Sequence, residues 1–139
     1  MQRVDITQDF RLPVSRIYEH LAEHENLAPL FGATVRRVRD GDSSRNGAGS
    51  VRALRVGPGP WFEETVTEAV PNERIAYRIS RGSPLRDHQG VMTFTSTPDG
   101  SRLHYVIEFR SAVPGLAKVV QLGLARNLTR GLRTLDHLA

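Results

Sequence analysis

Large apolar residues alternate with polar ones along much of the chain, a pattern typical of β-strands with one buried face. The clearest example is RLHYVIEFR at 102–110, where every second residue from Leu103 to Phe109 is large and apolar. Clusters of glycine, proline, asparagine and aspartate separate such segments and predict tight turns, so that the strands form an antiparallel meander. The expected strands span 2–12, 33–40, 51–57, 61–70, 74–80, 88–97 and 102–110.

Helical spacing interrupts this alternation in three places. Pro13 is expected to open a first helix, and ENLAPLFG at 25–32 predicts a second short helix that ends at Gly32. The third helix is expected from Pro114 to Ala139. Because it is long and amphipathic, it needs an apolar surface such as the sheet to lie on. Its apolar stripe consists of Leu116, Val120, Leu124, Leu128, Leu132 and Leu135.

These elements predict a single α+β domain over residues 1–139. Two short helices follow the first strand, and a curved antiparallel sheet of about seven strands wraps around the long C-terminal helix. No apolar run is long enough to span a membrane, and MQRVDITQDF at the start has no apolar signal core, so membrane insertion and export are not expected.

Alternation also predicts which side chains face the helix. We expect Val56 opposite Phe62 in one hairpin, with an Arg55–Glu63 ion pair on the other face. In the hairpin around PDGS at 98–101, a four-residue turn pairs Phe94 with Tyr105 and Met92 with Ile107. The space beneath the helix is then expected to be lined by Leu54, Val66, Tyr77, Met92, Phe94 and Tyr105.

Three polar residues share or border this apolar face. Glu64 would lose hydration there, which raises the pKa of a carboxyl and suits it to acid–base chemistry. The alternatives are an ion pair with Arg52 or a bulge that turns Glu64 to solvent. His88 begins a strand and is either a proton shuttle at the pocket mouth or a half-exposed structural residue. Glu64, His88 and Arg52 are therefore the catalytic candidates.

Gly123 and Gly131 lie in the middle of the long helix, where each costs about 1 kcal/mol relative to alanine. They are eight residues apart and therefore near the same face. Glycine there lets the helix approach the sheet closely, or leaves room for a ligand.

The order of elements and several segments resemble the START-like, or helix-grip, superfamily, and within it the polyketide cyclase/dehydrase and lipid-transport group. The segments that carry the likeness are ENLAPLFG, NGAGSVRAL, FEETVTEAVPNERIAYRI and TFTSTPDGSRLHYVIEF. The resemblance covers essentially the whole chain. It implies a cavity between the long helix and the sheet that holds a hydrophobic or aromatic small molecule.

The composition and short motifs of the chain argue against several other classes of function. The chain has no cysteine, which excludes disulfides and thiolate chemistry and favours the cytoplasm. The net charge is +4, but the arginines are scattered without interleaved aromatics, so nucleic-acid binding is not expected. HLAEH at 20–24 matches a zinc-protease pattern through His20 and His24, yet no third ligand is evident, so no metal is expected. No cofactor motif is found either.

The leading hypothesis is a protein that binds a polyketide-like or lipid-like molecule in this cavity. A cyclase, aromatase or dehydratase acting on such a molecule is the second, with Glu64 or His88 as the acid–base group and Arg52 and the tyrosines positioning carbonyls. A third is an interaction module whose pocket is filled. An enzyme needs polar groups that converge in the cavity, and the sequence does not show convergence. Monomer and homodimer both remain open.

Overall fold

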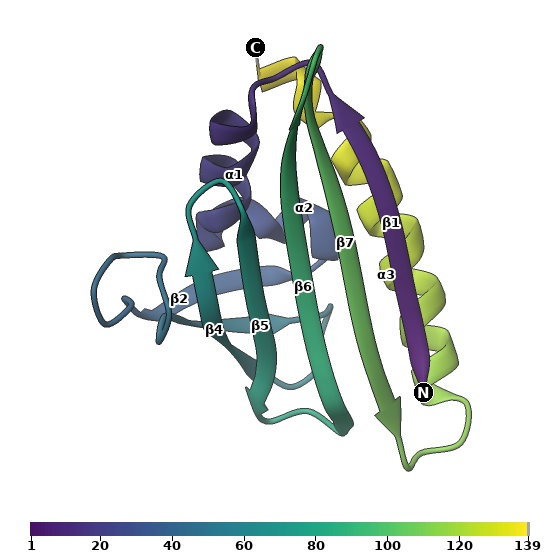
Figure 1. The fold of residues 1–139 in the computed structure, drawn as a ribbon. Helices are drawn as coiled ribbons and strands as arrows, with labels where there is room; N and C mark the ends of the chain where they lie inside the picture. Colours follow the sequence, from purple (N-terminus) through teal and green to yellow (C-terminus); the bar gives the residue numbers. More distant parts are fainter. Residues whose placement is uncertain (139) are drawn as a thin grey trace.

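The computed structural model describes residues 1–138, without the side chain of Leu138. Seven antiparallel strands form one sheet in the order β1-β7-β6-β5-β4-β3-β2, so the first strand closes against the last (Figure 1). The strands are β1 (Gln2–Phe10), β2 (Thr34–Arg39), β3 (Val51–Arg55), β4 (Phe62–Val70), β5 (Arg74–Arg81), β6 (Leu85–Thr97) and β7 (Gly100–Ser111).

The helices lie together on one side of this sheet (Figure 1). The long helix α3 packs along β1 and against α2. It ends at Arg133 and is followed by a short 3-10 helix, whereas one continuous helix to Ala139 was expected; Ala139 lies outside the described residues. The expected α+β helix-grip arrangement is confirmed. The helices are α1 (Val14–Ala22), η1 (His24–Leu27), α2 (Ala28–Phe31), α3 (Leu116–Arg133) and η2 (Leu135–Leu138).

The core forms where the alternating faces of the strands meet the helices. On β7 the four large residues from Leu103 to Phe109 are buried, while Arg102 before them and His104 among them are exposed. Leu128 and Leu132 of α3 are fully buried against this core. Val119 and Leu122, nearer the start of α3, are largely exposed. The second half of the helix is therefore the part that anchors it.

Both predicted hairpin registers are wrong by two residues. Phe62 lies opposite Leu54 instead of Val56, and Ala53 instead of Arg55 lies opposite Glu63. The expected Arg55–Glu63 pair does not form, because the Arg55 side chain turns into the loop and its Nε donates to the Gly59 carbonyl at 3.0 Å.

The second hairpin is tighter than expected. Its loop contains two residues, since Thr97 already pairs with Gly100. Consequently Met92 lies opposite Tyr105, and Phe94 lies opposite Leu103. A two-residue shift preserves the face of every side chain, so the predicted buried face is correct although its cross-strand partners are not.

Alternation also places Glu68 and Val56 on this face, but both are exposed for local reasons. A register shift between Val66 and Glu68 turns Glu68 to solvent. Val56 lies beyond the end of β3 and is exposed.

Candidate functional site

A cavity of about 280 Å³ lies between the sheet and the first half of α3. This volume is close to the lower end of small-molecule pockets, about 300 Å³. Most of the lining is apolar, and the polar side chains on it belong to Glu64, Tyr77, His88 and Asn127. The lining residues are Phe31, Ala33, Leu54, Val56, Phe62, Glu64, Tyr77, Ile79, Leu85, His88, Ile107, Val119, Val120, Gly123, Leu124 and Asn127.

Glu64 and Arg52 form a buried ion pair next to this cavity. Arg52 and Glu64 face each other on β3 and β4, and their side chains are 3% and 7% exposed. Arg52 Nε donates to Glu64 Oε1 at 2.8 Å, and Arg52 Nη2 lies at the same distance from that oxygen. The ion-pair alternative for Glu64 is therefore the one that the structure contains. Burial makes this pair costly to break from either side.

Aromatic rings surround the Arg52 guanidinium. Its Cζ lies 4.6 Å from the centre of the Tyr77 ring and 5.7 Å from that of Phe31, both within cation–π range. The Tyr77 and Tyr105 hydroxyls form a short hydrogen bond with each other. Burial raises the pKa of both phenols, so they stay protonated and neutral at physiological pH.

His88 approaches Glu64 from β6. The backbone N–H of Ile79 donates to His88 Nδ1 at 2.9 Å, so this nitrogen is an acceptor and the neutral ring carries its proton on Nε2. His88 Nε2 lies 3.9 Å from Glu64 Oε2. Burial lowers the pKa of His88, and Glu64 opposes this only in part, so the ring is neutral at pH 7. His88 is accordingly a hydrogen-bond donor toward the cavity.

The structure thus brings together the three catalytic candidates Arg52, Glu64 and His88. Glu64 and His88 line the cavity, whereas Arg52 lies behind Glu64. Among the predicted ligand-binding residues, Leu54 and Tyr77 line the cavity. The other four predicted residues are buried in the packed core and do not line this cavity: Val66, Met92, Phe94 and Tyr105.

Several lining residues were not predicted. Strand alternation could not predict Phe31 as a lining residue, because Phe31 belongs to the short helix α2. Asn127 interrupts the apolar stripe of α3 between Leu124 and Leu128, and such a polar residue is a signal that sequence reasoning could have used.

The two helix glycines have different roles. A Cβ on Gly131 would lie 2.5 Å from Leu30 Cδ2, so Gly131 allows close packing against α2. A Cβ on Gly123 would meet no heavy atom within 4 Å, and Gly123 lines the cavity. Close packing therefore occurs at Gly131, although against helix α2 instead of the expected sheet, and open space occurs at Gly123.

This difference predicts opposite outcomes for two leucine substitutions. Gly123→Leu should retain or slightly raise the thermal midpoint, because leucine favours helix by about 1 kcal/mol, while it lowers the affinity for a hydrophobic probe by occupying the cavity. Gly131→Leu should instead destabilise the domain by about 1–3 kcal/mol through overpacking against Leu30. Thermal denaturation and probe titration of both variants check this. If the two variants had the same thermal stability and the same probe affinity, the different roles of Gly123 and Gly131 would be contradicted.

The HLAEH segment does not place its two histidines on one helical turn. Helix α1 ends at Ala22 and Glu23 is extended, so His20 and His24 do not lie one turn apart on one helix. His24 is fully buried, and its Nε2 lies 3.0 Å from Ser50 Oγ, which in turn donates to the Gly47 carbonyl. Within residues 1–138 no group of three or more potential metal ligands is found.

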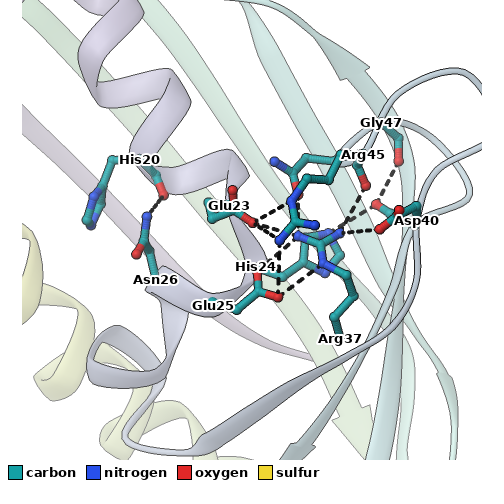
Figure 2. Close-up of polar contacts among 11 residues, drawn as sticks. His20, Glu23, His24, Glu25, Asn26, Arg37, Asp40, Arg45 and Gly47 are labelled. Atoms are coloured by element: carbon teal, nitrogen blue, oxygen red, sulfur yellow. Dashed lines mark hydrogen bonds and ion pairs between the residues drawn. The ribbon is translucent and has the colours of Figure 1, made fainter.

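The carboxylates beside His24 are engaged by arginines (Figure 2). Arg37 Nη2 lies 2.7 Å from Glu23 and 2.9 Å from Glu25, and Arg45 also reaches Glu23 at 3.0 Å. This network ties the end of α1 and η1 to the loop after β2. It is a structural junction, and the Arg37 guanidinium holds the pKa of Glu25 at about 2.

Buried His24 predicts acid sensitivity. Burial, reinforced by Arg52 and Arg37, lowers its pKa to about 3, whereas an unfolded histidine titrates near 6.5. Above pH 6.5, His24 is neutral in both the folded and the unfolded state, and the protein has its full stability. Below pH 6.5, the unfolded state binds a proton that folded His24 does not. The free energy of unfolding therefore falls by about 1.4 kcal/mol per pH unit toward pH 3. Urea denaturation at pH 7 and pH 5 should show this slope. His24→Gln should reduce it, and an unchanged slope would contradict the assignment.

Comparisons with known proteins agree with this architecture. The family model described as polyketide cyclase / dehydrase and lipid transport matches residues 1–139. The chain belongs to this family, whose members share the helix-grip fold seen here. No curated protein sequence matches significantly. Within residues 1–138, no helix is both long and apolar enough to cross a membrane.

Similar solved structures extend over almost the whole chain. The protein TTHA0849 from Thermus thermophilus is 19% identical with a TM-score of 0.76, covering 98% of this chain and 95% of its own. CV1439 from Chromobacterium violaceum is 19% identical with a TM-score of 0.70, covering 98% and 99%. The Aha1 dimer from Colwellia psychrerythraea is 14% identical with a TM-score of 0.71, covering 98% and 97%. At these identities the likeness concerns the fold alone.

Proposed function

We propose that the protein binds a hydrophobic or aromatic small molecule, of polyketide or lipid type, in the cavity between the sheet and α3. The observation that carries this proposal is the largely apolar cavity of about 280 Å³ with Glu64 and His88 on its wall. Burial of apolar ligand surface there gains roughly 25 cal/mol per Å². The family supports the same class of ligand. A cavity of this size argues against the filled pocket of an interaction module. The cytoplasmic location stays a prediction.

An acid–base enzyme is the second candidate, because the required convergence of polar groups is present. His88 Nε2 and Glu64 Oε2 are 3.9 Å apart at the cavity wall. Neutral His88 would donate to a ligand carbonyl oxygen and polarise the carbonyl, while Glu64 Oε2 would take the α-proton and pass it to the departing β-hydroxyl, which leaves as water. Because His88 Nδ1 already accepts the Ile79 N–H, His88 itself is unsuited to the role of base.

Fluorescence titration with the neutral probe N-phenyl-1-naphthylamine tests binding. We expect saturable 1:1 binding with roughly micromolar affinity. Glu64→Gln separates the two candidates, with Glu63→Gln on the neighbouring position as the matched control. A carrier should keep nearly the same probe affinity in both variants and show no turnover.

An enzyme should dehydrate a model β-hydroxy ketone to the conjugated enone, which is followed by its ultraviolet absorbance. Glu64→Gln should then lose this activity by about 100-fold or more while it still binds the probe. Absence of probe binding in the folded wild-type protein would refute both candidates.

A further inference from the structure

Two polar atoms at the cavity wall are left without a partner of their own. Both Arg52 contacts to Glu64 fall on Oε1, and among residues 1–138 no hydrogen bond to Glu64 Oε2 is found. His88 Nδ1 is occupied by Ile79, which leaves the Nε2–H of the neutral ring. The Glu64 and His88 side chains are 7% and 5% exposed, and both residues line the cavity, so a molecule bound there can reach these two atoms.

The separation of these two atoms is informative. At 3.9 Å, His88 Nε2 and Glu64 Oε2 are too far apart for a direct hydrogen bond, which needs about 2.7–3.2 Å. A single oxygen atom of a third group, however, can lie at about 2.8 Å from both. The two residues therefore form a donor–acceptor pair that is open to one bridging group.

The chemistry of the pair selects that group. It must accept a hydrogen bond from His88 and donate one to the carboxylate of Glu64. A ketone, ether or ester oxygen accepts but cannot donate, and an ammonium donates but cannot accept. A carboxylate would be repelled by Glu64. A hydroxyl satisfies both residues at once, because it carries one donor and free lone pairs.

We propose that the bound molecule is an apolar alcohol or phenol whose hydroxyl oxygen accepts from His88 Nε2–H and donates to Glu64 Oε2. This rests on the proposed binding of an apolar molecule in the cavity, and it names the functional group that is recognised there. Arg52 neutralises Glu64 from behind, so the carboxylate remains a strong acceptor without an unpaired buried charge.

A series of ligands with one ring system tests this at neutral pH. Naphthalene, 2-methoxynaphthalene, 2-naphthoate and 2-naphthol are compared by displacement of N-phenyl-1-naphthylamine from the full chain. We expect 2-naphthol to bind about tenfold tighter than naphthalene and 2-methoxynaphthalene, which is the gain of about one charge-assisted hydrogen bond. 2-Naphthoate should bind most weakly.

Variants assign the preference to the two residues. The ratio of the affinities for 2-naphthol and naphthalene should fall toward unity in Glu64→Gln and in His88→Phe, which has no donor, and remain in the control Glu63→Gln. If the wild-type protein bound 2-naphthol and naphthalene equally well, the hydroxyl assignment would be overturned. The proposed function would still stand in that case, because the probe and naphthalene bind. A ratio that persisted in both folded variants would overturn it as well. Failure of the probe itself to bind would instead refute the proposed function.

Discussion

Arg52→Met should lower the free energy of unfolding by about 3–5 kcal/mol, among the largest losses that a single substitution in this chain can cause. The change leaves the Glu64 carboxylate buried without its positive partner, since both contacts of the pair come from the Arg52 guanidinium. It also removes the cation that lies 4.6 Å from the centre of the Tyr77 ring. Urea denaturation followed by circular dichroism measures the loss.

Two further variants show whether the loss comes from the unpaired charge. The double variant Arg52→Met/Glu64→Leu should recover most of the stability, because it removes both buried charges together. Arg102→Met, which breaks an exposed ion pair with Asp9, should cost far less. If the double variant were as unstable as Arg52→Met alone, the burial of an unpaired carboxylate would not be the cause.

Phe94→Ala should cost about 3–5 kcal/mol by opening a new void in the core. Phe94 is 5% exposed, and its ring packs edge-on against Tyr18 with the centroids 5.2 Å apart. It does not border the existing cavity, so its removal creates empty space where atoms are now in contact.

Phe62→Ala is the matched comparison. Phe62 is only partly buried and lines the cavity, so truncation enlarges a space that is already there and should cost clearly less. Chemical denaturation of both variants checks the difference. Equal losses would contradict the division of this face into packed core and ligand cavity.

The sequence predicts the fold well because most strands have one apolar face. Alternation in β7, where Leu103 to Phe109 are all buried, is enough to orient the strand against the helices. The same pattern does not define turn length, since a two-residue shift leaves every side chain on its face. That is why Leu54, instead of Val56, pairs with Phe62.

The candidate site was predictable only in part. Alternation places Leu54, Tyr77, Phe94 and Tyr105 on one face, but it does not show where α3 rests on that face. The helix lies along β1, and Leu54 on β3 and Tyr77 on β5 border the cavity, whereas Phe94 on β6 and Tyr105 on β7 are packed in the core. Gly123 and Gly131 look alike in the sequence, yet only Gly131 touches α2, because contact depends on distant packing.

The central claim is that an apolar ligand occupies the space beneath the first half of α3. An NMR titration of the isotope-labelled protein with N-phenyl-1-naphthylamine tests it directly. We expect saturable shifts of the backbone amides of Ile79, Gly123 and Asn127, which line the cavity, and the loss of these shifts in Gly123→Leu. Saturable shifts centred on the distant loop of Ser44 and Gly47, or no saturable shift at all in the folded protein, would contradict it.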